Sequence, residues 1–237
     1  IYDEPFSDPS QIPTSLLSCF ASKNVKAALS GDGGDELFCG YNRYKSYEKV
    51  NFINNFLPEN IKKLIKKIEP NFLYSFFNKF PFLSNSFFKE LNKQNSLTKI
   101  KKLQSVINVK GPFEYYTILL NTGFDNKILK NYQNNQNSYF IRNFFDKHKE
   151  WDIIESMMAI DLTSYLPDNI LYKVDRACMF YSLENRSPFL DHELISFIWS
   201  LPLTYKLNGN NTKYLLKESL FRNIPREMFD RPKMGFS

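Results

Sequence analysis

The run Ser30-Gly31-Asp32-Gly33-Gly34-Asp35-Glu36-Leu37-Phe38 decides how the chain is organised. Before it, the short apolar run at residues 25–29 predicts a buried strand, and after it Leu37, Tyr41 and Tyr44 recur at helical spacing. We therefore expect a strand, a tight turn and a helix. Three glycines within four positions indicate a backbone that adopts conformations closed to other residues, or that approaches a ligand closely.

The acids of this run favour a site for a metal and a nucleotide. Backbone N–H groups at a helix N-terminus attract anions such as phosphate, whereas the carboxylates of Asp32 and Asp35 would repel one. A bound Mg²⁺ resolves this conflict, because it takes hard oxygen ligands and shares them with nucleotide phosphates. The alternative interpretation is structural: Asp35 and Glu36 cap a helix, and the glycines serve only the turn.

Several familiar sites do not fit the sequence. The dinucleotide fingerprint fails because Glu36 occupies the third glycine position, and no Walker lysine follows. An EF-hand fails because the oxygen ligands do not continue through its loop. The chain has two histidines, and its three scattered cysteines lack metal or disulfide spacing. Zinc chemistry and histidine-based triads are therefore not expected.

Composition is that of an ordinary globular protein. With 237 residues, 43% hydrophobic and 24% charged, the chain can form one large domain or two small ones. No apolar stretch is long enough to span a membrane, and reduced thiols favour a cytoplasmic location. The net charge of +6 is uneven: residues 45–148 hold 17 Lys and Arg against 7 Asp and Glu, so the middle is basic and the ends are acidic.

Helical signals dominate the first two thirds of the chain. A proline-rich opening precedes a helix expected over about residues 15–23. In the basic middle, apolar residues at i, i+3, i+4 and i+7 predict a helix bounded by Pro58 and Pro70, namely Ile61, Leu64, Ile65 and Ile68. Its other face carries Lys62, Lys63, Lys66 and Lys67. We interpret this face as solvated, in preference to a nucleic-acid or membrane patch.

Aromatic and amide residues fill the rest of the middle. We expect its dense phenylalanines to wedge helices together rather than to stack on bases: Phe72, Phe76, Phe77, Phe80, Phe82, Phe87 and Phe88. Residues 131–137, mostly Asn and Gln, predict a loop or a helix junction.

The last third predicts three more helices. Leu171, Val174 and Cys178 have helical spacing, which indicates a helix from about residue 168. After the break at Ser187-Pro188, Asp191 is the expected N-cap of a helix that reaches Leu201, and another helix covers about 212–221. Little strand signal remains after residue 29. The sequence thus predicts a single, mostly helical domain with a partial α/β element.

Four stretches, taken together and in this order, resemble the synthetase domain of glutamine-hydrolysing asparagine synthetases. They are residues 2–10, the run at 30–38 followed by Gly40-Tyr41-Asn42-Arg43-Tyr44, residues 166–177 (with Lys173-Val174-Asp175-Arg176) with 183–191, and Arg231-Pro232-Lys233-Met234-Gly235-Phe236. The resemblance implies the C-terminal portion of an adenine nucleotide alpha hydrolase-like (ATP pyrophosphatase) domain. It divides the chain into a nucleotide-loop part (1–44), a basic helical part (45–150) and a part that completes the site (151–237).

The resemblance also implies roles for single residues. Ser30, Gly31 and Gly33 would contact the nucleotide, Asp35 would ligate Mg²⁺, and Asp32 would serve the formation and use of an acyl-adenylate, at a position where many members carry glutamate. Lys173 would neutralise the leaving pyrophosphate. We interpret Asp175 and Arg176 as an ion pair that fixes Lys173. Arg186 is expected to bond helix-terminal carbonyls or Asp191, and Lys233 to lie near the pocket.

The implied reaction is ATP-dependent conversion of aspartate to asparagine, with ammonia from glutamine hydrolysed in an N-terminal glutaminase domain. That domain and the phosphate-gripping loop are not in the sequence, so we expect the chain alone to be inactive. The amino-acid sequence of residues 4–9 differs from that of the aspartate-specific bacterial enzymes and leaves the identity of the acceptor acid open. Two alternatives remain: an amidotransferase with another carboxylate acceptor, and a nucleic-acid-binding or tRNA-modifying ATP pyrophosphatase. Homodimerisation is also left open.

Overall fold

A computed structural model of the chain describes residues 1–3, 8–79, 93–120 and 135–229. Two compact units can be distinguished, and each is described by itself. The first unit joins Ile1–Tyr44 to Glu150–Ser237, and the second is Lys45–Lys149. The second unit coincides closely with the basic stretch of the sequence.

A parallel pair of short strands organises one end of the first unit. β1 (Ala27–Leu29) pairs with β2 (Glu184–Arg186), with Ala28 opposite Asn185. β2 was not predicted, because three polar residues show no strand periodicity. The expected burial of β1 was also wrong: Leu29 is 75% exposed, because in the described part of the chain the sheet has only these two strands. Parallel strands are usually covered on both faces.

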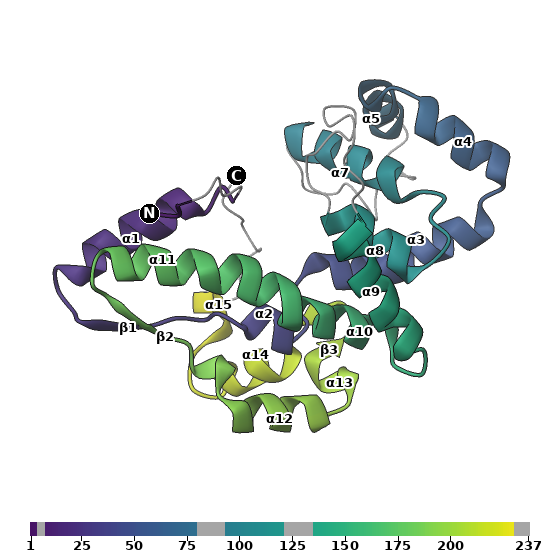
Figure 1. Cartoon of the computed structure of the whole chain (residues 1–237). Helices are drawn as coiled ribbons and strands as arrows, with labels where there is room; N and C mark the ends of the chain where they lie inside the picture. The colour runs from purple at the N-terminus through teal and green to yellow at the C-terminus, as the bar shows by residue number, and fades with distance from the viewer. Residues whose placement is uncertain (4–7, 80–92, 121–134, 230–237) are drawn as a thin grey trace. The chain divides into compact units, whose positions relative to one another are not determined.

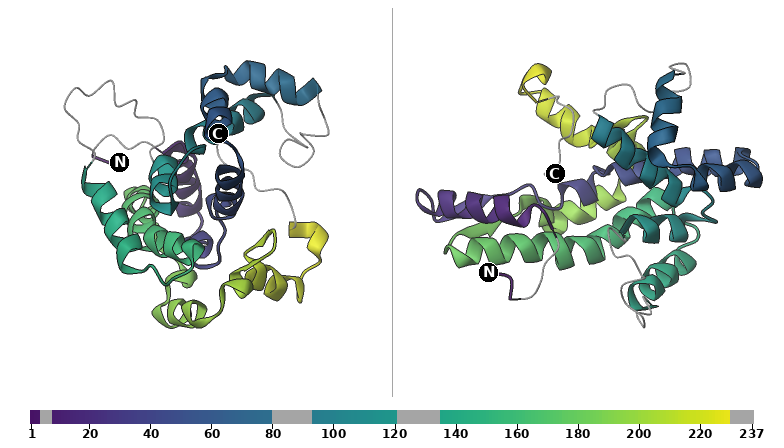
Figure 2. Two further views of the ribbon diagram at one scale, coloured as in Figure 1. Left: turned by 90° about the vertical axis from the view of Figure 1, so that its right-hand side faces the viewer. Right: turned by 90° about the horizontal axis from the view of Figure 1, so that it is seen from above.

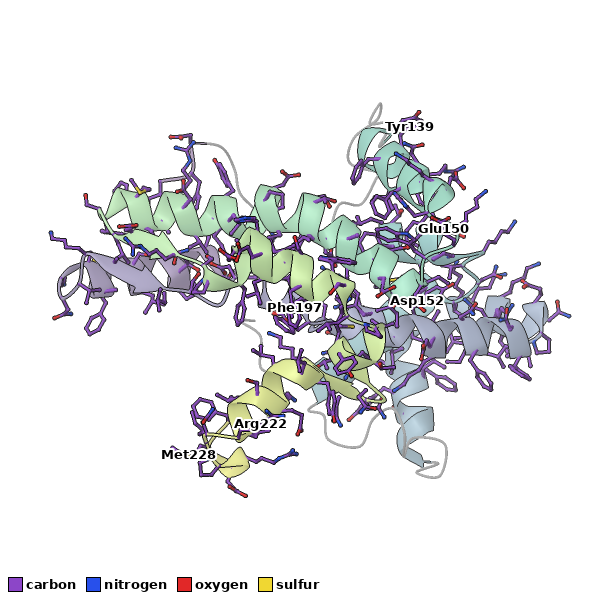
Figure 3. The ribbon with its side chains drawn as sticks, turned by 90° about the horizontal axis from the view of Figure 1, so that it is seen from below. Tyr139, Glu150, Asp152, Phe197, Arg222 and Met228 are labelled. Atoms are coloured by element: carbon purple, nitrogen blue, oxygen red, sulfur yellow. The ribbon has the colours of Figure 1, made fainter. Side chains whose placement is uncertain are left out.

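The longest helical segment of the first unit consists of three consecutive elements without interruption. α10 (Ile153–Ile160) leads into the π-helical segment η1 (Asp161–Leu171), which contains Pro167 and continues as α11 (Tyr172–Phe180). Asp152, labelled in Figure 3, caps α10 by accepting a hydrogen bond of 2.7 Å from the Ile154 N–H. The helix predicted from about residue 168 therefore begins much earlier. α1 (Gln11–Ser22), four residues longer at its start than expected, lies alongside α11 (Figures 1 and 2).

The glycine-rich run packs on the segment that follows β2. It forms a single helical turn, α2 (Gly34–Leu37), and not the longer helix that Tyr41 and Tyr44 suggested. Leu37 and Phe38 share a core with Ile198 and with partly buried neighbours from η1 and from the segments after β2: Leu162, Phe189, Leu194, Ile195, Trp199, Leu201, Leu215 and Leu216. This core holds the turn against η2 (Pro188–Leu190) and α12 (His192–Ser200).

The C-terminal helices follow the predicted pattern. Asp191 caps α12 as expected, because its Oδ1 accepts hydrogen bonds from the N–H groups of Glu193 and Leu194, at 3.0 and 3.1 Å. α13 (Leu203–Lys206) then leads into a small antiparallel hairpin, β3 (Leu207–Asn208) and β4 (Asn211–Thr212). The predicted helix near 212–221 is α14 (Tyr214–Phe221), and α15 (Arg226–Phe229) follows it, with Met228 labelled in Figure 3.

The second unit is helical throughout its described residues. Its elements are α3 (Asn42–Phe56), which begins in the first unit, α4 (Glu59–Lys67), α5 (Pro70–Lys79), α7 (Lys93–Val106), α8 (Pro112–Leu120) and α9 (Asn135–Lys147). Tyr47 and Tyr115 pack edge to face in its core, with ring centroids 5.2 Å apart. Val50, Ile100 and Tyr116 are among the other buried residues of this unit.

Helix α4 matches the predicted boundaries, and Lys63, Lys66 and Lys67 are exposed as predicted, but the fourth lysine and part of the apolar face differ from the prediction. Lys62 is buried, and its Nζ donates a hydrogen bond of 2.8 Å to Glu59 Oε1. Ile61 and Leu64 are 43% and 59% exposed. The pair with Glu59 explains why one lysine of the expected solvated face is turned inward. Phe72 is exposed; Phe80, Phe82, Phe87, Phe88, residues 131–134 and Lys233 lie outside the described residues.

No helix among the described residues has the length and apolar character needed to cross a membrane.

Candidate functional site

The site begins where the two parallel strands end. Ser30 follows β1 and Ser187 follows β2, and the Ser30 N–H donates a hydrogen bond of 2.8 Å to the Arg186 carbonyl oxygen. The segments that follow the two strands therefore leave the sheet side by side at its carboxyl edge. In open α/β sheets this edge is where ligands bind.

A network of polar side chains lies at this edge. The Ser30 hydroxyl donates to Asp32 Oδ2 at 2.8 Å, and its oxygen lies 2.8 Å from Ser187 Oγ. Asn185 Nδ2 donates to Ser30 Oγ at 3.2 Å. A hydroxyl has one proton, so Ser187 must be the donor to Ser30. Asn185 and Ser187 thus donate hydrogen bonds to Ser30, and Ser30 in turn donates to the carboxylate of Asp32.

The glycines have different functions within the turn. Gly33 has φ of +86°, and a Cβ atom there would lie 2.4 Å from Leu190 Cδ2, so this position needs glycine for both backbone conformation and packing. At Gly31, no described atom lies within 4 Å of a Cβ position. The turn is therefore closely packed at Gly33 and open at Gly31. Because α2 has only four residues, the helix-dipole argument made from the sequence loses its basis.

Asp35 forms an ion pair that the sequence did not reveal. Its Oδ1 lies 3.2 Å from Lys213 Nζ, and the two side chains are 27% and 30% exposed. Lys213 comes from the loop before α14, and its N–H donates a hydrogen bond of 2.9 Å to the Phe38 carbonyl. A lysine 178 residues from Asp35 in sequence carries no local signal for such a contact.

Lys173 contacts the opening segment of the chain. This buried ammonium donates hydrogen bonds to Asp8 Oδ2 at 2.9 Å and to Ser10 Oγ at 2.6 Å. Burial opposes ionisation of Asp8, but the hydrogen bonds from Ser10 and Lys173 outweigh it and hold the pKa of the Asp8 carboxyl below its ordinary value. Among the described residues, Lys173 forms no ion pair with Asp32 or Asp35. Its role toward pyrophosphate stays a proposal.

The partners predicted for Arg176 and for Arg186 were both wrong. Arg176 pairs with Asp3 at 3.7 Å, and its guanidinium lies over the Tyr172 ring, because it faces the opening segment rather than the adjacent Asp175. Arg186 Nε donates to Glu184 Oε1 at 2.8 Å within β2, where alternate residues of a strand lie on the same face.

A buried layer of charged and aromatic residues lies behind the turn. Tyr41 donates a hydrogen bond of 2.6 Å to Glu36, and burial raises the pKa of both groups. Asp161, at the start of η1, accepts hydrogen bonds from Arg43 and from the Tyr44 hydroxyl. These contacts fix the start of α3 relative to η1 within the first unit.

The donor set suits a metal that brings most of its own ligands. The described residues contain no cluster of three or more His, Cys, Asp or Glu side chains that could hold an ion by themselves. Asp32 and Asp35 are partly exposed, and carboxylate oxygens are ligands that Mg²⁺ accepts when phosphates and waters supply the others. The residues present therefore fit Mg²⁺ bound together with a nucleotide, and do not form a closed metal cage.

A carboxylate-bearing turn lies at the carboxyl edge of two parallel strands, closely packed on one side and open at a glycine, and this is the edge at which open α/β sheets bind ligands. The family model for asparagine synthase matches residues 1–237. The chain belongs to this family.

Individual relatives agree with this assignment. A Mycobacterium bovis protein provisionally named glutamine-hydrolysing asparagine synthetase is 29% identical over 234 residues, which cover 99% of this chain and 33% of the relative. Asparagine synthetase 1 of Bacillus subtilis is 26% identical over 242 residues, 99% of this chain and 34% of the relative. A protein of Penicillium rubens named amidase is 24% identical over 93% of this chain and 33% of the relative. No solved structure matches the chain.

The chain spans about a third of the length of the asparagine synthetases that it matches.

Proposed function

We propose that the chain forms part of the nucleotide site of an ATP-dependent ligase that makes an amide from a carboxylate and ammonia, with aspartate as the acceptor and asparagine as the product. The observation that carries this proposal is the network of Ser30, Asp32, Asn185 and Ser187 at the carboxyl edge of β1 and β2, beside the open position at Gly31. Family membership supports the reaction class.

The reaction requires two bond exchanges. A carboxylate oxygen of the acceptor attacks the α-phosphorus of ATP, which forms β-aspartyl-AMP and breaks the bond to the β-phosphate, so that pyrophosphate leaves. Ammonia then attacks the acyl carbon, AMP leaves with the electron pair of the acyl–oxygen bond, and a base takes a proton from nitrogen. The first step brings a carboxylate to a triphosphate, both anionic, so positioning and charge neutralisation supply most of its rate enhancement.

The chain's own residues have distinct functions in this scheme. Ser30 and the backbone at Gly31 and Gly33 would contact the nucleotide. Asp32, held by the Ser30 hydroxyl at 2.8 Å, would lie at the acyl-adenylate and serve as the proton acceptor. Asp35 would hold Mg²⁺, which when bound neutralises phosphate charge.

Lys173 would change partners during the reaction. Its ammonium is paired with Asp8 and Ser10 in the structure. Transfer of this flexible side chain to pyrophosphate would place a mobile positive charge on the leaving group. A glutaminase domain elsewhere in the full-length protein would supply ammonia, as the names of the relatives imply.

Substitution of Asp32 tests the proposal. In the full-length protein, we expect Asp32→Ala to abolish aspartate-dependent release of pyrophosphate from ATP while glutamine hydrolysis continues. Asp146→Ala, which removes an exposed acid of α9, is the matched control and should leave both activities unchanged. Pyrophosphate release by Asp32→Ala at the parent rate would contradict the assigned role.

The acceptor is tested separately. The relative named amidase supports a variant of the same chemistry with another carboxylate, as in the tailoring of polysaccharides or peptides. Pyrophosphate release is measured with aspartate and with a panel of other carboxylic acids. Release that depends on Asp32 but not on aspartate would retain the ligase and replace its substrate.

A further inference from the structure

Lys213 is held at the turn by its main chain as well as by its side chain. Its φ of +54° lies in the left-handed region, which is uncommon for lysine. In this conformation its N–H donates to the Phe38 carbonyl at 2.9 Å, and its Nζ lies 3.2 Å from Asp35 Oδ1. The loop before α14 is thus anchored to the glycine-rich run at two points.

Glycine at position 40 makes room for this ion pair. A Cβ atom at Gly40 would lie 1.9 Å from Asp35 Oδ1 and 2.4 Å from Lys213 Cε. The pair could not keep these positions beside any larger residue. The Gly40 N–H also donates to the Asp35 carbonyl at 2.7 Å, so the same glycine is bonded to the main chain of the residue that forms the pair.

Stability alone does not account for this arrangement. A left-handed backbone costs a non-glycine residue free energy. An ion pair whose members are 27% and 30% exposed returns little of it, because water screens the attraction. Strained residues that persist next to a ligand-binding turn commonly serve the ligand.

We propose that Lys213 is a positioning residue that holds the Asp35 carboxylate in the absence of a divalent cation and gives it up when the cation binds. This inference rests on the proposed function, in which Asp35 is the Mg²⁺ ligand. An ammonium and a divalent cation compete for the same carboxylate lone pairs and repel one another. Because a lysine side chain is long and flexible, it can withdraw while its main chain stays bonded to Phe38.

Competition predicts that removal of the ammonium strengthens cation binding. The probe is Mn²⁺ in the presence of ATP, because nucleotide phosphates supply the other ligands of the metal; it is titrated into the full-length protein, and the protein-bound ion is followed by EPR. We expect Lys213→Met and Lys213→Gln to tighten Mn²⁺ binding about two- to fivefold, the factor that corresponds to a partly exposed ion pair. Lys213→Arg, which keeps the charge, should bind as the parent does.

Controls distinguish the proposed role of Lys213 from the proposed role of Asp35 as the metal ligand. Lys217→Met removes the same charge one turn further along α14 and should leave Mn²⁺ affinity unchanged. Thermal unfolding of the same samples shows whether each variant is folded. Asp35→Asn should lose the site; if it binds Mn²⁺ like the parent, the metal role of Asp35 fails and this proposal with it.

Two results would overturn the role of Lys213 alone. If Asp35→Asn loses Mn²⁺ while both neutral Lys213 variants bind it with parental or lower affinity, the lysine does not compete with the cation. If neither the parent nor any Lys213 variant binds Mn²⁺, the lysine likewise does not compete with a cation. In either case the ligase proposal still stands on the Asp32 experiment.

Discussion

Asp161→Asn should sharply destabilise the first unit. Asp161 is fully buried; its Oδ2 accepts hydrogen bonds from Arg43 Nε at 3.0 Å and from the Tyr44 hydroxyl, and its Oδ1 lies 2.7 Å from Arg43 Nη2 in an ion pair. The guanidinium also lies 4.0 Å from the Tyr41 ring centroid. Asparagine keeps the shape but removes the negative charge, so the Arg43 guanidinium, whose side chain is 19% exposed, loses its ion pair with Asp161. Loss of one partner of a buried pair costs about 3–5 kcal/mol.

Tryptophan fluorescence measures this effect directly. Both tryptophans of the chain, Trp151 and Trp199, belong to the first unit, with ring centroids 6.2 Å apart. Their emission during urea unfolding of the 237-residue chain therefore reports on the unit that contains Asp161. With an unfolding slope of about 3 kcal/mol per molar urea, the midpoint should fall by roughly 1 M or more.

A control and a double variant complete the test. Arg186→Met breaks an exposed pair with Glu184 and should leave the urea midpoint unchanged. Once Arg43→Met is present, Asp161→Asn should cost much less than in the parent, since the two residues are in contact. An Asp161→Asn midpoint equal to that of the parent would refute the inference that this ion pair holds α3 to η1.

Two further predictions concern the turn and pH. Gly33→Ala should lower the free energy of unfolding by about 1–2 kcal/mol from its left-handed backbone alone, with more from the contact at Leu190, whereas Gly31→Ala should have no steric effect; urea midpoints of both variants check this. The pKa of Asp8 is lower in the folded than in the unfolded chain, so its stabilising contribution is present at neutral pH and is lost as pH falls below about 4 through the folded-state pKa. Asp8→Asn should accordingly be destabilising at pH 7 and progressively less so as the pH falls below about 4; a pH-independent effect would show that the pair with Lys173 does not contribute.

Local patterns in the sequence predicted helices that coincide with α1, α4, α11, α12 and α14. The boundaries of α4 follow from Pro58 and Pro70, and the cap at Asp191 follows from its position before an apolar stripe. These signals arise within a few residues, where capping and periodicity determine the structure. The same locality explains the failure at β2, whose three residues are a strand only because β1 lies beside them.

Long-range contacts were beyond the reach of the sequence. The positions of Ser30, Asp32 and Asp35 at a strand-to-helix turn were expected, but their partners Asn185, Ser187 and Lys213 were not. Asn185 and Ser187 lie in a stretch that resembles the family, which was a usable signal. Nothing adjacent in sequence indicates that Lys213 meets Asp35. Likewise, Lys173 was identified, whereas its pairing with Asp8 depends on the packing of α1 on α11.

The winding of η1 sets the direction in which the side chains of α11 point. Each residue turns an α-helix by about 100°, and a π-helical stretch accommodates residues that a regular helix of the same length would not. Deletion of one residue between Asp161 and Leu171, with the wide winding retained, would turn α11 around its own axis. Lys173 would then face away from Asp8, so the chain length of η1 is as critical to the direction of that ammonium as the identity of any residue in it.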